Sequence, residues 1–194
     1  MRRRKKTAAQ SVKKIIALAL SIGIVVALLV YRRDMRDWFL DEHKYDREIA
    51  RAAGKHGVDS RLIKAVIYRE SRFKPDAKGR DGEVGLMQVI PSCAVKDWAR
   101  CHKVETPAKG LLFKPELNID IGTWYLSKAL RQWAPYKHGI ELALCQYNAG
   151  PSRAAKWKPD SPEGAVMERI DIKSTRMYVN AVMEKYQQYC KQKN

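Results

Sequence analysis

The stretch "IKAVIYRESRF" at residues 63–73 indicates a helix and raises a chemical question. Ile63, Val66, Ile67 and Glu70 are spaced at i, i+3, i+4 and i+7, which places them along one face of an α-helix. The first three are apolar and indicate a buried face, whereas the last is a carboxylic acid. The pattern therefore predicts a helix whose core-facing row ends in an acidic group.

Helical periodicity extends over most of the chain after residue 44 and predicts a mainly α-helical domain. Asp59 can cap the start of the helix at 60–71, and Gly57 can end the helix before it. Proline and glycine interrupt residues 73–90, where at most a small β-hairpin is expected, and residues 101–115 are predicted to be loop. Helices are expected at 45–56, 60–71, 91–100, 117–130, 138–149, 152–157 and 175–189.

The first residues have the pattern of a membrane anchor. Residues 1–14 carry seven bases and no acid, and residues 15–31 carry no charge. As a helix this run is about 25 Å long, just enough for a bilayer core. We expect a basic cytoplasmic tail at 1–14, a transmembrane signal anchor at 15–31, a juxtamembrane linker at 32–44 and a domain at 45–194 that faces the periplasm or cell wall. The alternative is a cleaved signal peptide, although the small residues at 17–19 lie too early in the run for a cleavage site.

The charge favours an anionic partner. The formal net charge is +17, and the residues through Arg47 hold 12 bases and 5 acids, so +10 is spread over the remainder. Such a field attracts nucleic acid, acidic lipid or an acidic wall polymer. The aromatic residues lie at core spacing and do not alternate with bases, as a stacking platform for nucleic acid would require. We therefore predict no nucleic-acid partner.

The cysteines and histidines do not predict a metal site. Four cysteines and four histidines are scattered along the chain without a CxxC pair. Cys145 falls within an apolar helical run and is expected to be a buried free thiol. Pairing among Cys93, Cys101 and Cys190 is left open.

Glu70 has two interpretations. It is either a surface carboxylate paired with a nearby base or a functional acid. Burial disfavours the charged form, and the negative end of the helix dipole opposes a carboxylate, so both effects raise the pKa of Glu70. A carboxylic acid that stays protonated near neutral pH can donate a proton to a leaving oxygen.

The residues around Glu70 resemble a known family. "RESRFKPDAKGRDGEVGLMQVIPSCA" is similar to the catalytic segment of soluble lytic transglycosylases of glycoside hydrolase family 23, the peptidoglycan-cleaving relatives of goose-type lysozyme. Three further blocks follow in the family's order: "NIDIGTWYL" (118–126), "ALCQYNAGP" (143–151) and "STRMYVNAV" (174–182). The resemblance implies a lysozyme-like, mainly helical domain that binds glycan strands and needs no cofactor.

The same resemblance implies roles for individual residues. Glu70 would be the catalytic acid and then the base. Tyr178 is expected to be structural or at most to line the pocket, and Met87 has a packing role as its alternative. Ser174 stands where the family tends to have glutamate, which puts one sugar subsite in doubt. The residues expected to bind substrate are Ser71, Gly85, Met87, Gln88, Tyr147 and Asn148.

The expected reaction depends on the number of carboxylates. Most glycoside hydrolases use two, but the nearby Asp81 and Glu83 stand in a glycine-rich loop and are expected to be solvated. The family's chemistry implies that the substrate N-acetyl group supplies the nucleophile and that 1,6-anhydro-MurNAc ends form. The alternatives are a goose-lysozyme-like hydrolase of the same bond and a weakly catalytic module that binds the wall.

Overall fold

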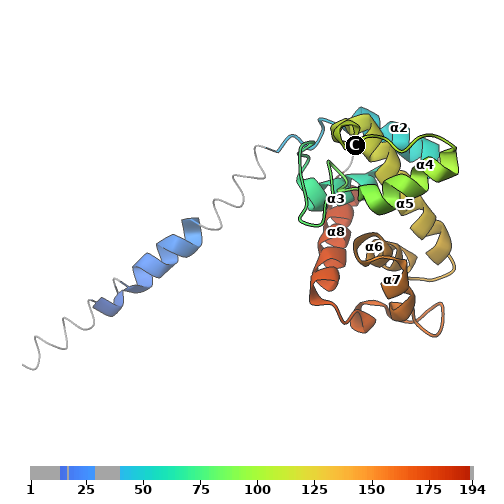
Figure 1. The fold of residues 1–194 in the computed structure, drawn as a ribbon. Coiled ribbons are helices and arrows are strands. Elements are labelled where there is room, and N and C mark those ends of the chain that lie inside the picture. The colour runs from blue at the N-terminus through green and yellow to red at the C-terminus, as the bar shows by residue number, and fades with distance from the viewer. Residues whose placement is uncertain (1–13, 17, 29–39, 193–194) are drawn as a thin grey trace, which may run out of the picture. The chain divides into compact units, whose positions relative to one another are not determined.

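The computed structural model describes residues 14–16, 18–28 and 40–192. The chain divides into two units, Met1–Asp41 and Glu42–Asn194, which are drawn in Figure 1. Each unit is described by itself below.

Residues 14–16 and 18–28 of the first unit are helical, and their large apolar side chains, among them Leu18 and Ile22, are exposed. In the described part of the chain, no helix combines the length and the apolar character that crossing a membrane requires. The predicted span at 15–31 includes positions 17 and 29–31, which lie outside the described residues.

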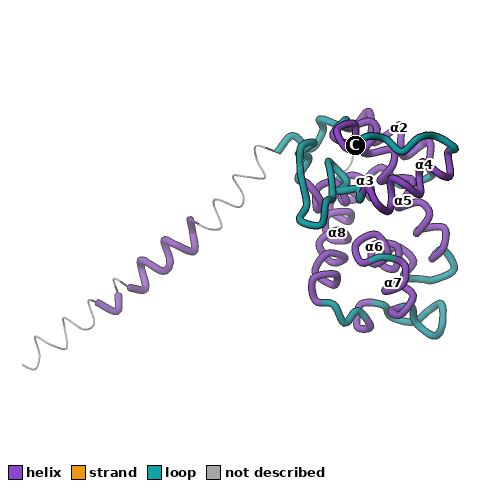
Figure 2. Tube along the Cα trace, in the orientation of Figure 1, coloured by secondary structure: helices purple, strands orange, loops and turns teal. Residues whose placement is uncertain are grey.

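The second unit consists of helices joined by loops, and its described residues contain no β-strand (Figure 2). Its longest helices are the two that begin at Pro115 and Lys173. The elements are α2 (Asp46–His56), α3 (Ser60–Ser71), η1 (Pro91–Val95), α4 (Lys96–His102), η2 (Lys109–Phe113), α5 (Pro115–Trp133), α6 (Gly139–Ala149), α7 (Pro151–Trp157), η3 (Met167–Arg169) and α8 (Lys173–Lys191).

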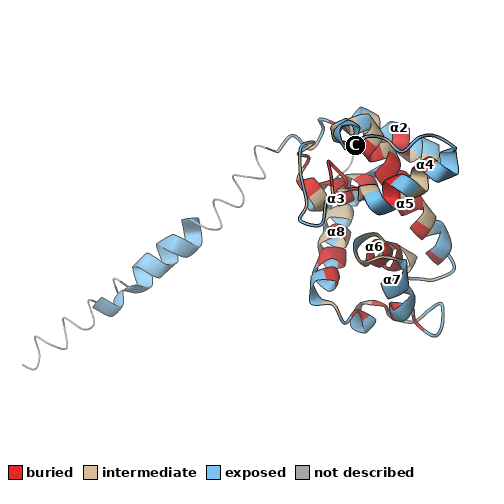
Figure 3. Cartoon of the chain, viewed as in Figure 1, coloured by how far each residue is buried: buried red, intermediate tan, exposed pale blue. Residues whose placement is uncertain are grey.

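The core is organised around α6. This helix packs against α5, α7 and α8, while α3 lies along α8 and α2 lies on α5. Figure 3 shows the buried residues concentrated on the facing surfaces of these helices. The middle of α6, Leu142 to Cys145, is completely buried. Because other helices enclose α6 on several sides, its apolar residues are not confined to one face of the helix.

Most of the predicted helices are confirmed, including two of their caps. Gly57 has the left-handed φ of 65° that ends α2, and the Asp59 side chain accepts a hydrogen bond from the Arg61 N–H at the start of α3. The predicted helix at 91–100 differs, because its first turn is a π-helical one in which the Val95 N–H bonds to the Ile90 carbonyl. The predicted loop at 101–115 contains η2, a turn too short for periodicity to reveal.

The segment expected to hold at most a small hairpin forms only isolated bridges, between Lys78 and Val84 and between Val84 and Val89. The turn at Gly85 has a φ of +78°, and the Gln88 N–H donates to the Gly85 carbonyl. The chain therefore folds back too tightly for a regular ladder to form.

Side chains from both ends of the second unit form an end clamp, defined here as Glu42, Lys185 and Tyr189. Glu42 accepts hydrogen bonds from the Lys185 ammonium at 2.8 Å and from the Tyr189 hydroxyl at 2.9 Å. Glu42 and Lys185 are largely shielded from solvent, which makes the pair stronger than a surface ion pair. The end clamp fastens the C-terminal half of α8 to the segment that precedes α2.

Asn118 in α5 holds the loop that precedes η1. Its amide group is completely buried and accepts a hydrogen bond from the Met87 N–H at 2.8 Å. It also donates to the carbonyls of Val84 and Leu112, each at 2.8 Å. One side chain thus satisfies three backbone groups that a buried, irregular loop would otherwise leave unpaired.

Gly85 is tightly enclosed by this arrangement, so we expect Gly85→Ala to destabilise the domain. A Cβ at this position would lie 2.8 Å from both Asn118 Cγ and the Leu112 carbonyl oxygen. The positive φ adds strain, and the total loss in free energy of unfolding should be about 3 kcal/mol or more, measured by urea denaturation.

Gly82→Ala is the matched control for this prediction. Gly82 also has a positive φ, of 93°, but no atom lies within 4 Å of the added methyl group. Its loss should be about 1–2 kcal/mol, from backbone strain alone. Equal losses in the two variants would show that the contacts with Asn118 and Leu112 do not matter.

Candidate active site

Glu70 stands in the last turn of α3, as the apolar row predicts. Ile63, Val66 and Ile67 are completely buried, and they anchor the helix so that Glu70 follows them toward the interior. Beyond the helix end, Phe73 is 5% exposed and fixes the direction in which the chain leaves. The Glu70 residue itself keeps partial access to solvent. It therefore combines a desolvated carboxyl group with partial exposure of the residue.

The Glu70 carboxyl group has a hydrogen-bond partner on a distant element. Tyr178 of α8 is 1% exposed, and its hydroxyl donates to Glu70 Oε1 at 2.7 Å. The pKa of Glu70 is raised from 4.5 to about 7, mainly by burial and to a smaller extent by the negative charge of Glu83. The Tyr178 hydrogen bond and the positive charge of Arg69 act in the opposite direction. Because burial dominates, a large fraction of Glu70 is protonated at neutral pH and can act as a general acid.

Tyr147 of α6 is near enough to the same carboxyl group for the charge of Glu70 to act on its hydroxyl. Its hydroxyl donates to the Met87 carbonyl at 2.8 Å, which connects α6 to the loop held by Asn118. Burial and the nearby Glu70 charge hold the pKa of the Tyr147 hydroxyl, like that of Tyr178, well above its ordinary value. Both tyrosines therefore remain neutral hydrogen-bond donors throughout the pH range in which Glu70 titrates.

A cavity of about 230 Å³ opens beside Tyr147. Gln88 and Asn148, both predicted to bind substrate, line it, and Tyr125 stands edge-on to Tyr147 with 5.8 Å between the ring centres. Cys93 also lines the cavity, and its sulfur lies 3.9 Å from the Tyr125 hydroxyl. Aromatic faces next to amide groups suit the binding of a sugar, which has both apolar C–H surfaces and hydroxyl groups.

A larger cavity, of about 330 Å³, lies between α2 and α5. Its charged groups are mostly paired with each other, as Lys55 is with Asp120 at 2.8 Å. No predicted site residue lines this cavity. We therefore place the candidate site at the smaller one.

Most of the predicted substrate-binding residues make internal contacts. The side-chain amide of Gln88 donates to the carbonyls of Ala77, at 3.2 Å, and Gly85, at 2.8 Å. The Ser71 hydroxyl donates to the Ile67 carbonyl within α3, at 3.2 Å. Met87 is completely buried, and its sulfur accepts a hydrogen bond from Thr123, so its packing alternative describes its position. Gly85 is enclosed by Asn118, as described above. A contact of these residues with sugar stays a prediction.

Two residues, Tyr178 and Glu83, influence Glu70 more directly than the sequence predicts. Tyr178 was expected to be structural or to line the pocket, but it contacts the carboxyl group of Glu70 directly. Its position in the "STRMYVNAV" block was the available signal. Glu83 was expected to be solvated, but it is partly buried and its charge acts on Glu70, whereas Asp81 is exposed as predicted.

The described residues contain neither a disulfide nor a cluster of potential metal ligands. No group of three or more His, Cys, Asp or Glu side chains in the described ranges could hold a metal ion. All four cysteines are free thiols. Cys145 is buried as predicted, and burial raises the pKa of its thiol to about 12.

The chain matches the family model of the Transglycosylase SLT domain over residues 47–168. It belongs to this family. The SLT domain also resembles solved structures of lytic transglycosylases. The first is an inactive glutamate-to-glutamine mutant of Slt from Pseudomonas aeruginosa, with 30% sequence identity and a TM-score of 0.66, covering 78% of this chain and 25% of that one.

Two further structures show the same likeness. The 70 kDa soluble lytic transglycosylase SLT70 from Escherichia coli has 28% identity and a TM-score of 0.65, covering 76% of this chain and 24% of that one. A complex of the 70-kDa soluble lytic transglycosylase with bulgecin A has 25% identity and a TM-score of 0.64, covering 78% and 25%. The chain thus spans about a quarter of the length of these proteins. The prediction of a mainly helical, lysozyme-like SLT domain is confirmed.

Because the pKa of Glu70 is raised, we expect the free energy of unfolding to depend on pH. Between pH 4.5 and about pH 7 the carboxyl group ionises in the unfolded chain but keeps its proton in the folded one, so the folded state loses stability as the pH rises through this window. Glu70→Gln removes the effect. The variant should be more stable than the wild type at pH 8, by about 3 kcal/mol, and this excess should shrink toward pH 4.

Urea unfolding at both pH values measures this difference. Glu105→Gln is the matched control, because Glu105 is exposed and its replacement should not change the dependence of stability on pH. A Glu70→Gln variant whose stability runs parallel to that of the wild type at all pH values would contradict the assignment.

Proposed function

We propose that the protein is a peptidoglycan lytic transglycosylase that cleaves the MurNAc-β-1,4-GlcNAc bond. The observation that carries the proposal is Glu70, a carboxylic acid whose pKa burial raises to about 7 and which accepts a hydrogen bond from Tyr178. Tyr147, whose hydroxyl pKa the charge of Glu70 raises, lines the neighbouring cavity together with Asn148. Membership of the SLT family and the likeness to lytic transglycosylases from two bacteria support it.

In the proposed reaction Glu70 first donates its proton to the glycosidic oxygen. The carbonyl oxygen of the muramic acid N-acetyl group attacks the anomeric carbon as the bond to the leaving oxygen breaks. Glu70, now a carboxylate, takes the proton of the 6-hydroxyl group. The 6-oxygen then displaces the N-acetyl oxygen from the anomeric carbon and closes a 1,6-anhydro ring. One carboxyl group serves as acid and then as base, and no cofactor takes part.

A second candidate is hydrolysis of the same bond by water. It is favoured by Glu83, whose charge acts on Glu70 and which is therefore a possible second carboxylate. Asp81, in the same loop, is exposed and does not contribute to the Glu70 pKa. The two reactions give different ends, because an anhydro end is lighter than a hydrolysed end by one water.

We expect Glu70→Gln to abolish cleavage of purified sacculi while the fold and wall binding persist. Glutamine cannot donate a proton, so the loss should be at least a thousandfold. Mass spectrometry of the wild-type digest should find 1,6-anhydro-MurNAc ends.

Three results would lead to other conclusions. Reducing ends alone would identify the hydrolase. A fully active Glu70→Gln variant would refute the role of Glu70. A wild type that binds sacculi without cutting them would identify a wall-binding module.

We also propose that a single N-terminal helix anchors the protein in the cytoplasmic membrane, with its N-terminus inside. The support is the uncharged run at 15–31, which has basic residues before it and Arg32 and Arg33 after it. The SLT domain would then face the periplasm or cell wall, where its glycan substrate lies.

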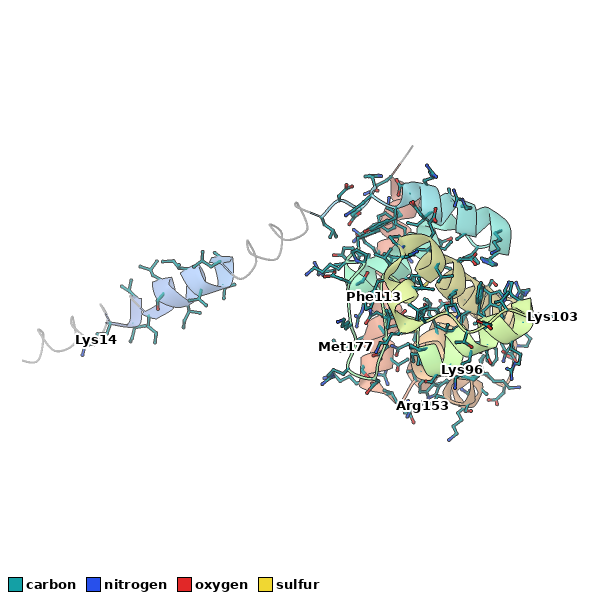
Figure 4. The ribbon with its side chains drawn as sticks, turned by 45° about the horizontal axis from the view of Figure 1, so that its top comes forward. Lys14, Lys96, Lys103, Phe113, Arg153 and Met177 are labelled. Carbon is teal, nitrogen blue, oxygen red and sulfur yellow. The ribbon has the colours of Figure 1, made fainter. Side chains whose placement is uncertain are left out.

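The basic surface should strengthen binding to the wall. Lys96, Lys103 and Arg153 are exposed and project from the domain in Figure 4, and the residues after Arg47 carry a net +10. Peptidoglycan stem peptides carry free carboxylates, so binding of Glu70→Gln protein to sacculi should weaken as salt rises, by about tenfold or more between 50 and 500 mM NaCl. Co-sedimentation measures this, and retention that does not change with salt would contradict it.

A further inference from the structure

Lys185 is a charged residue in a row of α8 that is otherwise buried. The row consists of Tyr178, Val182, Lys185 and Tyr189, which are spaced at i, i+4, i+7 and i+11 and therefore lie on one face of the helix. The other three residues are at most 5% exposed, and the Lys185 side chain is 15% exposed. A lysine placed this deeply needs partners, because burial disfavours its charge.

The partners of Lys185 come from different parts of the domain. Its ammonium group lies 2.8 Å from Glu42 Oε1 in the end clamp, 4.3 Å from the ring centre of Tyr68 in α3 and 4.8 Å from that of Tyr189. Aromatic faces attract a cation, most strongly where water is excluded. Lys185 is therefore held between α3 and the segment that precedes α2.

Lys185 is connected to the candidate active site through α8 itself. The helix lies along α3, and near its start the Tyr178 hydroxyl donates to Glu70 at 2.7 Å. Tyr178 and Lys185 are seven residues apart, which is about 10 Å along the helix. Because both belong to one helix, the position at which Lys185 is held determines how far Tyr178 extends toward Glu70.

We propose that Lys185 is a positioning residue that sets the register of α8 on α3, so that the Tyr178 hydroxyl reaches Glu70. The proposal deepens the proposed function and rests on it. A buried ion pair often adds little to stability, because the loss of water offsets the attraction, but it can favour one arrangement of two helices over others. A shift of α8 would separate Lys185 from Glu42 and Tyr68, while the apolar side chains of the helix could repack.

A neighbouring contact favours the same register but constrains it less. Tyr186 donates to Asp59 at the start of α3, at 2.9 Å. Asp59 is also paired with Arg61 at 2.7 Å, and its side chain is more exposed than that of Lys185. Water can therefore replace this contact more easily than it can replace the contacts of Lys185.

Loss of the register should raise the pKa of Glu70, because the Tyr178 hydrogen bond lowers it. Arg69 also lowers this pKa and Glu83 raises it. The Tyr147 hydroxyl of α6 stays neutral, since burial holds its own pKa well above the ordinary value. A change at Lys185 replaces none of these groups.

The test is the titration of the ¹³C-labelled Glu70 carboxyl by NMR in the full-length protein. Lys185→Met keeps an unbranched side chain without the charge and should raise the pKa of Glu70 by about 0.5 pH unit. Glu42→Gln should also raise it. Direct electrostatics predicts opposite directions for the two variants, because one removes a positive charge and the other a negative one. A rise in both therefore reports the register and not the charge.

Three further variants serve as controls. In a Tyr178→Phe background, which lacks the hydrogen bond to Glu70, neither change should raise the pKa of Glu70. Lys185→Arg keeps the charge and the ring contacts and should titrate like the wild type. Lys191→Met removes an exposed charge from the same helix and should have no effect.

Several outcomes would overturn the proposal. They are shifts of opposite sign in Lys185→Met and Glu42→Gln, a rise that persists without the Tyr178 hydroxyl, and a loss of stability in urea with an unmoved titration. If Lys185→Met does not fold, Glu42→Gln decides the question, because the sign of its shift already separates register from charge.

Cleavage of sacculi tests the proposed function separately. If the wild type cleaves, the basic limb of its kcat/KM profile should move with the NMR titration in each variant. If it does not cleave, the proposed function fails, while the titration still confirms or overturns the role of Lys185.

Discussion

The candidate site depends on one buried amide. Asn118 bonds to three backbone groups at once, and it thereby fixes the loop that carries Gly85, Met87 and Gln88 against α5. Because the Met87 carbonyl in turn accepts the hydroxyl of Tyr147, the position of that tyrosine depends on the same loop. An irregular segment can be buried next to a binding cavity only when its polar groups are satisfied in this way.

The second requirement is an acid that is both desolvated and reachable. The apolar row of α3 brings Glu70 inward, and Tyr178 meets it from α8. The single hydrogen bond does not offset the loss of water, so the carboxyl group keeps its proton to about neutral pH. This arrangement assigns opposite tasks to the neighbours of Glu70. Burial raises the pKa of Glu70 so that the group can act as an acid. The hydrogen bond from Tyr178 and the nearby charges adjust the pH at which its proton is lost.

Local patterns predicted the helices well and the contacts between them poorly. The caps at Gly57 and Asp59 and the row that ends in Glu70 follow from spacing along the chain, so they could be predicted. The hydrogen bond between Tyr178 and Glu70 joins positions far apart in the sequence and depends on how α3 packs on α8, which no single helix reveals. Glu83 stands in a loop without periodicity, so nothing in its surroundings indicated the direction of its side chain.

The end clamp of Glu42, Lys185 and Tyr189 has a consequence for the connectivity of the domain. Because the two ends of the second unit meet there, a short peptide could join them without disturbing the helices. New termini could then open within the exposed loop at 104–106, which follows the end of α4. The order in which the helices follow one another would change while their packing stayed the same. Such a circular permutant could be attached to a surface through its new termini, which lie near the middle of the natural sequence.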